Sequence, residues 1–159
     1  MKKIITLVAA VGAMFVVSCN QQVVTTESFH PVKCEFLNAE GDGSITLRAY
    51  GQGRHRGDAI EQARKNAVRE VMLVGVNVPG DALMSRPLIT KVNAEEKYAE
   101  FLRDFFTDDS DYKKFYTKRD RRHNSNEKHW SGTQMKISTT VRVLRSDLEQ
   151  YLKDNGIIK

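Results

Sequence analysis

A glycine-rich loop between an alternating segment and an alanine-rich segment is the first place where this sequence could do chemistry. Gly51 and Gly53 match the first two glycines of a dinucleotide-binding loop, which needs a third glycine at its sixth position. Arg56 occupies that position, the next glycine is Gly57, and the Gly-Lys-Ser/Thr ending of a P-loop is missing. The sequence therefore predicts a structural turn, in which glycines permit unusual backbone angles between a strand and a helix.

Basic residues give the same loop a second possible role. Arg54 and Arg56 stand at the expected helix start, where backbone amides and the helix dipole attract negative charge. We expect a weak anion site there. Asp58 is expected to cap the helix.

The other residue types that commonly do chemistry form no known catalytic or metal-binding pattern. Asp108, Asp109 and Asp111 are close together, but the spacing of a calcium-binding loop is incomplete. No Gly-x-Ser-x-Gly elbow is present, and no cysteine–histidine pair can be assigned. No two histidines are four residues apart (His30, His55, His123, His129). We therefore predict no catalytic residues, no metal and no cofactor, and hence a protein that is not an enzyme.

A cysteine at the end of an apolar run predicts a covalent modification. Two lysines precede the run from Ile4 to Val17, which is shorter than the roughly 20 residues of a transmembrane helix and is typical of a secretory signal. The run ends in Val16-Val17-Ser18-Cys19, which resembles the lipobox of bacterial lipoproteins. In that family the signal is cut before the cysteine, whose thiol then carries a diacylglycerol. The resemblance implies a membrane anchor on Cys19, since two or three acyl chains bind a bilayer permanently.

This anchor suggests a domain plan and a location. We expect residues 1–18 to be the signal, residues 19–30 the lipidated cysteine and a flexible tether, and residues 31–159 one domain. Asn20 follows the cysteine where proteobacterial lipoproteins of the inner membrane have aspartate, so the resemblance implies the outer membrane. The next residues carry no acidic cluster, which favours the periplasmic face over the cell surface. Cys34 is then left to be buried or to pair between chains.

A basic segment, residues 113–128, is the strongest candidate for a functional surface, with a net charge of +5. Its aromatic neighbours would suit single-stranded nucleic acid, but outside the cytoplasm we expect no nucleic acid. A protein partner or an anionic envelope component such as lipid phosphate, lipopolysaccharide or glycan fits better. The alternative is a solvated hairpin whose charges protect an edge strand. Its basic residues are Lys113, Lys114, Lys118, Arg119, Arg121, Arg122 and Lys128.

The patterning of apolar residues predicts the elements that position these candidates. Residues 34–37 suggest a short strand, and residues 44–50 and 135–143 alternate as half-buried strands do. A helix with an alanine stripe is expected over 58–74, followed by a loop or short strand with a turn at Pro79–Gly80.

Two further helices and a hairpin complete the prediction. A second helix is expected to begin after Asn93 and to bury Tyr98, Phe101, Leu102 and Phe105. It is expected to end at the acidic residues 108–111, which would be exposed to solvent. The basic segment is one arm of a hairpin that turns near residues 124–126. A last helix begins with the capping box at Ser146 and ends at Asn155-Gly156. We predict a single α+β domain, an antiparallel sheet with helices packed on one face.

Three stretches together resemble a known family. The strand "ITLRAYGQG", the helix "DAIEQARKNAVREV" and the pair "ISTTVRVLRSDLEQYLKDNG" are similar to a small domain of flagellum-associated outer-membrane lipoproteins. A similar unit forms the N-terminal part of the flagellar assembly protein T. The resemblance implies a small accessory domain without a catalytic site, and the chain departs from it in the Phe-rich helix and the basic segment.

These observations lead to two hypotheses of function. The first is a non-enzymatic outer-membrane lipoprotein that serves as a periplasmic accessory or scaffold subunit, with a membrane anchor on Cys19 and a protein partner in the cell envelope. The alternative is a binding module for an anionic envelope component, acting through residues 113–128.

Overall fold

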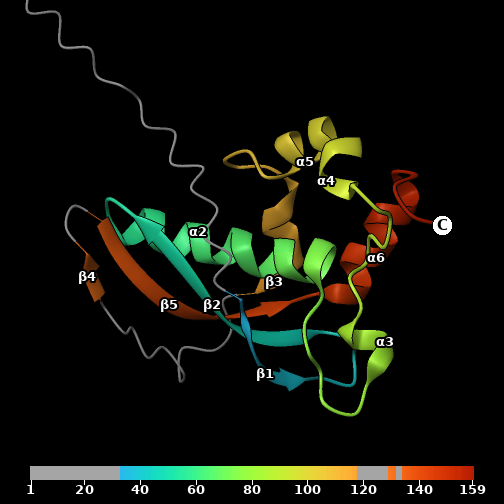
Figure 1. Cartoon of the computed structure of the whole chain (residues 1–159), viewed down its shortest axis with the longest axis horizontal. Coiled ribbons are helices and arrows are strands. Elements are labelled where there is room, and N and C mark those ends of the chain that lie inside the picture. The colour runs from blue at the N-terminus through green and yellow to red at the C-terminus, as the bar shows by residue number, and fades with distance from the viewer. Residues whose placement is uncertain (1–32, 118–128, 132–133) are drawn as a thin grey trace, which may run out of the picture. The chain divides into compact units, whose positions relative to one another are not determined.

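An antiparallel sheet is the frame of the computed structural model, which describes residues 33–117, 129–131 and 134–159. The sheet has the strand order β1-β2-β5-β3, and β4 also pairs with β5 (Figure 1). Its central pair, β2 and β5, runs from Ile45 opposite Val143 to Gly53 opposite Met135. The strands are β1 (Glu35–Ala39), β2 (Ile45–Gly53), β3 (Tyr116–Thr117), β4 (His129–Ser131) and β5 (Gln134–Val143).

The two faces of this sheet differ in polarity because successive strand residues point to opposite sides. On one face, Ile45, Leu47 and Val141 are almost fully buried in a core that also includes residues of the helices. The alternate residues, such as Arg48 and Arg142, are polar and lie on the opposite face. This confirms the predicted α+β domain, with an antiparallel sheet and its helices on one face.

Helix α2 (Arg56–Arg69) packs against β2 so closely that both elements need small residues. Its alanine stripe, Ala59, Ala63 and Ala67, has no exposed surface. A Cβ atom on Gly51 would lie 2.1 Å from the carbonyl oxygen of Ala59 and 2.4 Å from the amide nitrogen of Ala63. On Gly53 it would lie 2.6 Å from the amide nitrogen of Ala59. The glycines are therefore required for close approach.

The expectation that these glycines adopt unusual backbone angles is wrong. Among the residues that the structure describes, the glycines with positive φ are Gly43, Gly75, Gly80 and Gly156, which lie in turns and at helix ends. Gly80, at the predicted Pro79–Gly80 turn, is one of them.

The start of α2 also differs from the prediction. His55 is the N-cap residue and Asp58 is the third residue of the helix. The Asp58 carboxylate accepts a hydrogen bond of 3.3 Å from the backbone amide of His55. Asp58 thus neutralises the helix start from inside the first turn, as expected of an acidic residue near the positive end of a helix dipole.

At its C-terminal end α2 continues as a π-helix (Glu70–Val74), which forms hydrogen bonds to residues 88 and 89. The amide of Gly75 donates to the carbonyl of Glu70. The carbonyls of Val71 and Met72 accept from the amides of Leu88 and Ile89, at 3.2 and 2.9 Å. These bonds satisfy carbonyls that a helix end leaves without partners, and they hold residues 75–93 against the end of the helix. That segment, called here the α3 segment, contains the short helix α3 (Ala82–Ser85).

The predicted second helix is broken in two. Helix α4 (Ala94–Lys97) is followed by α5 (Ala99–Phe105), with Tyr98 between them at φ −113°. The Tyr98 hydroxyl donates to the carbonyl of Ile157 at 3.1 Å. A 3₁₀-helix (Asp111–Phe115) and α6 (Arg145–Asp154) then pack their aromatic rings against those of α5, so that Phe105 lies 5.8 Å from Phe115 and 5.7 Å from Tyr151 between ring centroids.

Two details of the C-terminal half correct the prediction. Lys113 and Lys114 lie in the 3₁₀-helix rather than in a strand. The predicted turn at 124–126 lies outside the described residues. Strands β4 and β5 pair antiparallel, with Ser131 opposite Gln134. Helix α6 begins at Arg145 with Leu144 as N-cap, not with a capping box at Ser146.

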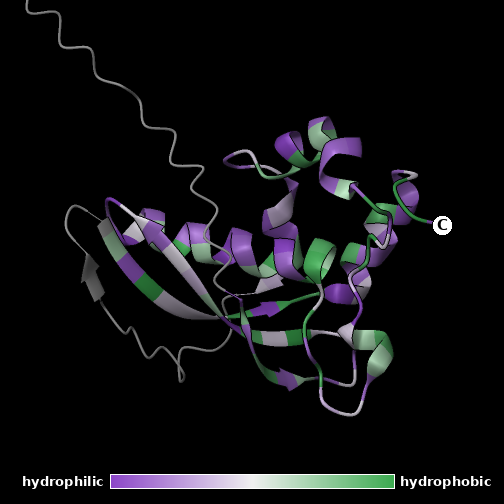
Figure 2. Cartoon of the chain, in the orientation of Figure 1, coloured by the Kyte–Doolittle hydropathy of each residue, from purple (hydrophilic) through white to green (hydrophobic). Residues whose placement is uncertain are grey.

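The described helices are short or amphipathic rather than uniformly apolar (Figure 2). Among residues 33–117, 129–131 and 134–159, none of them has both the length and the apolarity needed to cross a bilayer.

Candidate functional site

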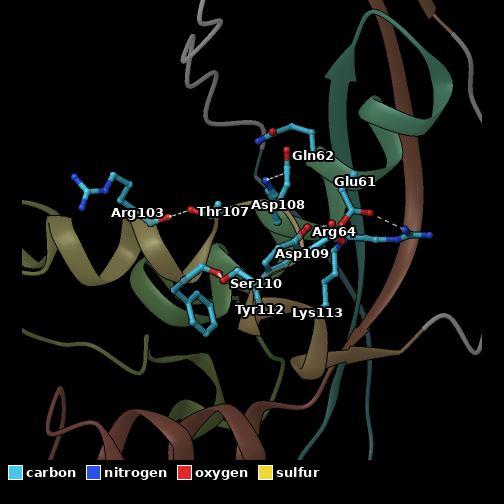
Figure 3. Close-up of polar contacts among 12 residues, drawn as sticks. Glu61, Gln62, Arg64, Arg103, Thr107, Asp108, Asp109, Ser110, Tyr112 and Lys113 are labelled. Carbon is cyan, nitrogen blue, oxygen red and sulfur yellow. Dashed lines mark hydrogen bonds and ion pairs between the residues drawn. The ribbon is translucent and has the colours of Figure 1, made fainter.

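A polar network between α2 and the 3₁₀-helix is the most connected group of ionisable side chains in the described structure (Figure 3). Glu61 stands at its centre, on the side of α2 that faces residues 108–113. The Tyr112 hydroxyl donates a short hydrogen bond to Glu61 Oε1. Arg64, one turn further along α2, donates from Nη1 to Glu61 Oε2 at 2.9 Å, and Lys113 Nζ lies 3.7 Å from Glu61 Oε1.

The electrostatics of this network fix the charge of each group. Burial raises the pKa of Glu61, but the hydrogen bonds from Tyr112 and Arg64 and the charge of Lys113 outweigh it and leave the pKa below its usual value. Burial and the bond to Glu61 raise the pKa of Tyr112 well above that of a free tyrosine. Glu61 therefore stays ionised and Tyr112 stays protonated at neutral pH. Because general acid–base catalysis needs a pKa near the working pH, this pair is poorly suited to it.

Cations also stack on the rings of the network. The guanidinium carbon of Arg64 lies 5.5 Å from the centre of the Tyr116 ring, and Lys65 Nζ lies 5.3 Å from that of Tyr112. Tyr112 has no exposed surface. Ser110 reinforces the turn before it by donating to the carbonyls of Asp104 and Phe105, each at 2.7 Å.

The acidic run after α5 belongs to the same network. Asp108 accepts from Lys65 of α2 at 2.8 Å, and that hydrogen bond lowers the pKa of the Asp108 carboxyl. Asp109 and Asp111 accept from Lys113 and Lys114, each at 2.6 Å. The carboxylates of the predicted solvated helix terminus therefore form ion pairs while Asp108 and Asp109 stay exposed to solvent. Across the described ranges, no group of three or more histidine, cysteine or acidic residues is arranged to hold a metal ion.

These ion pairs involve two residues of the predicted basic surface, residues 113–128. Lys113 and Lys114 form ion pairs with Asp109 and Asp111, and the Lys114 side chain stays largely exposed. The other five residues of the set lie outside the described residues, as does Cys19 (Lys118, Arg119, Arg121, Arg122, Lys128).

The predicted anion site at the start of α2 is open to solvent. Arg54 and Arg56 are both exposed, on either side of the N-cap residue His55. The Asp58 carboxylate already accepts from the His55 amide. The charge that would attract an anion is therefore partly neutralised by the chain itself.

Sequence reasoning did not identify Glu61, Arg64 or Tyr112. The spacing of Glu61 and Arg64 by three residues on one helix was a visible signal for an ion pair. Tyr112 gave none, because its approach to Glu61 depends on how residues 106–112 fold back onto α2.

Cys34 lies just before β1 and is half-buried against the core. Burial, together with the nearby charge of Glu70, raises the pKa of the Cys34 thiol to about 12. Burial also raises the pKa of Glu70, against the opposing effect of Lys33. Because the thiolate is the reactive form, Cys34 is a poor nucleophile in the folded protein.

Comparison with known proteins finds no relative of this chain. No family model matches the chain, no curated protein matches it, and no solved structure matches its fold.

Proposed function

We propose that this protein is a non-enzymatic lipoprotein of the bacterial outer membrane, which serves as an accessory or scaffold subunit on the periplasmic side. The observation that carries the proposal is the sequence Val16-Val17-Ser18-Cys19 at the end of a short apolar run preceded by two lysines. A lipid on Cys19 would hold the domain at a membrane without a transmembrane helix.

The described domain supports a binding role over a catalytic one. Its most connected ionisable groups, Glu61 and Tyr112, have pKa values that move away from neutrality. Their partners are supplied by the chain itself, and they join α2 to the segment that carries Lys113. A network of this kind acts as a tie between elements, which is what a rigid scaffold domain needs.

Metabolic labelling tests the anchor directly. The protein is produced in a Gram-negative host that is fed an alkyne-bearing fatty acid, and incorporation and membrane fractionation are followed. We expect Cys19→Ser to abolish both labelling and membrane association. Cys34→Ser is the matched control, because it removes the second cysteine and should leave both unchanged. Labelling that persists in Cys19→Ser would refute the proposal.

The scaffold role is tested separately by crosslinking in the native envelope. We expect a defined protein partner to be captured with the lipidated chain and to be lost when Cys19→Ser releases the chain from the membrane. Recovery of the lipidated protein without any stable partner would refute the scaffold role and leave the anchor intact.

The alternative function, binding of an anionic envelope component, now depends on residues 118–128, which retain a net charge of +3. Changing Lys118, Arg119, Arg121 and Arg122 to serine should weaken binding to phosphatidylglycerol vesicles or to lipopolysaccharide, and salt should weaken it too. Lys113→Ser with Lys114→Ser is the matched control, because both lysines are already ion-paired within the chain. Equal losses in the two variants would contradict this assignment.

A further inference from the structure

The C-terminal end of α6 carries a dipeptide whose side chain and backbone can react with each other. Asn155 is followed by Gly156, the one Asn-Gly pair in the sequence. Asparagine is thermolabile because the next backbone nitrogen can attack its side-chain carbonyl carbon, and glycine has no Cβ to hinder that attack. Both residues are exposed, so water reaches the pair.

The reaction that this pair supports is deamidation. The Gly156 nitrogen loses its proton and bonds to Cγ of Asn155, while the bond from Cγ to Nδ2 breaks and the side-chain nitrogen leaves as ammonia. Water then opens the resulting succinimide ring at either of its carbonyl carbons. The products are aspartate and isoaspartate, in which the main chain runs through the side-chain carbon. The reaction consumes water and needs no other reactant.

The folded helix end engages both reacting groups. The Gly156 amide donates to the carbonyl of Lys153 at 2.9 Å, and Asn155 Nδ2 donates to the carbonyl of Tyr151 at 2.8 Å. Gly156 has a φ of 69°, the left-handed conformation that commonly ends a helix and satisfies its last carbonyls. Attack requires the Gly156 nitrogen to turn toward Cγ of Asn155 and to give up its proton. The reaction therefore needs an opened helix end.

The residue after the pair determines how readily this end opens. Ile157 is 7 % exposed and belongs to the hydrophobic core, and its amide donates to the carbonyl of Leu152 at 2.9 Å. Its carbonyl accepts from the Tyr98 hydroxyl at 3.1 Å and from Lys91 Nζ at 3.2 Å. Burial of the Ile157 side chain and these bonds to a distant segment oppose the fraying that is common at chain ends. Tyr98 and Lys91 therefore act on the Asn-Gly pair through Ile157.

The product of the reaction cannot restore the same helix end. An aspartate at position 155 has no Nδ2 to donate to the Tyr151 carbonyl. Its charge is also unfavourable at the negative end of the helix dipole, where Asp154 is already present. Isoaspartate, in addition, lengthens the main chain just before Ile157 and shifts that residue relative to its partners in the core.

We propose that Asn155-Gly156 is a site of spontaneous deamidation and that its modification is a one-way latch on the C-terminal end of the domain. The site is closed while Ile157 is docked in the core. Opening of the helix end allows the reaction, and the product then keeps that end open. This inference is independent of the lipid anchor and of the scaffold role, because it depends only on residues of the described domain.

The test follows deamidation of the full-length protein over time, by mass spectrometry of its C-terminal peptide and by enzymatic methylation of isoaspartate. We expect the Asn-Gly pair to react on the order of tenfold more slowly in the folded protein than in guanidinium chloride at the same pH and temperature. Tyr98→Phe and Lys91→Met each remove a donor to the Ile157 carbonyl and should speed the reaction of the folded protein several-fold. Tyr50→Phe is the matched control, because it removes a tyrosine hydroxyl that is bound to Glu35 on the sheet, and it should leave the rate unchanged.

Asn155→Asp tests the latch itself. We expect the amide of Ile157 to exchange its hydrogen several-fold faster in this variant than in the unmodified protein, while the amides of β5 keep their rates. Unchanged exchange at Ile157 refutes the latch. Equal deamidation rates in the folded and the unfolded protein refute the closed site, and no deamidation in the unfolded protein refutes the site altogether. If Tyr98→Phe and Lys91→Met both react at the rate of Tyr50→Phe, docking of Ile157 does not control the reaction.

Discussion

Replacing Gly51 with alanine should separate the helix from the sheet and destabilise the fold. The added Cβ would lie 2.1 Å from the Ala59 carbonyl oxygen, 2.4 Å from the Ala63 amide nitrogen and 2.9 Å from the Ala63 Cα. All three are backbone atoms, so no side chain can rotate to make room. Ordinary van der Waals contact begins at about 3.4 Å, and α2 must therefore move away from β2 by about 1 Å.

The loss of stability can be estimated from the packing between α2 and β2 that this movement weakens. Overpacking a core lowers the free energy of unfolding by about 1–3 kcal/mol when side chains can adjust. Because backbone atoms cannot move aside in this way, we expect Gly51→Ala to cost about 3 kcal/mol or more. A loss of about 3 kcal/mol is a large part of the roughly 5–15 kcal/mol that stabilises a domain. For a domain of this size it should lower the melting temperature by about 10 °C.

Thermal and urea unfolding followed by circular dichroism would measure this loss. Gly57→Ala is the matched control: Gly57 lies in the first turn of the same helix, and a Cβ there meets nothing within 4 Å. Alanine at an exposed helical position should stabilise the protein by about 0.5–1 kcal/mol. If Gly51→Ala unfolds at the same temperature as the unmodified protein, the close packing of α2 on β2 is wrong.

Three further predictions concern ionisable groups. Tyr112→Phe removes the hydrogen bond to Glu61 and should cost about 1–3 kcal/mol in urea unfolding; an unchanged midpoint would show that the network does not tie α2 to the 3₁₀-helix. Because the pKa of Glu61 is lowered in the folded state, its stabilising effect is present above the unfolded pKa of about 4.3 and is lost as pH falls through the folded pKa. Glu61→Gln should therefore flatten the decrease in melting temperature below about pH 4, and a parallel pH profile would contradict this. The pKa of about 12 for the Cys34 thiol leaves very little reactive thiolate in the folded protein at pH 8. A thiol reagent should therefore react on the order of a thousandfold more slowly with the folded protein than with the urea-unfolded protein. Comparable rates would show that the thiol is not buried.

The sequence predicts the framework of the fold because the framework depends on local patterns. The alternation in residues 44–50 and 135–143 places one side of each strand toward a core, and the alanine spacing in residues 58–74 identifies a helix that packs closely. Both patterns are direct consequences of strand and helix periodicity. The predicted start of α2 lies two residues later than the observed one because His55 is an uncommon N-cap, while Asp58 has the expected chemistry three positions later.

Contacts between segments that are far apart along the chain are harder to predict from the sequence. The chain breaks between α4 and α5 at Tyr98, whose hydroxyl bonds to the Ile157 carbonyl, and the widening of α2 into a π-helix accompanies bonds to residues 88 and 89. In each case the bonding partner lies far along the chain, so local propensity does not predict the contact.

The sequence alone determines that the chain has a lipobox-like motif at Cys19, a basic segment and an α+β pattern, because these depend on residue type and spacing. The tertiary structure decides what the candidate residues can do. It shows that Gly51 and Gly53 serve close packing rather than backbone bending, since the distances to Ala59 and Ala63 leave no space for a side chain. It also shows that Lys113 and Lys114 are occupied by Asp109 and Asp111. Charge can be counted from a sequence, but whether a charge is free depends on which groups the fold brings within reach of it.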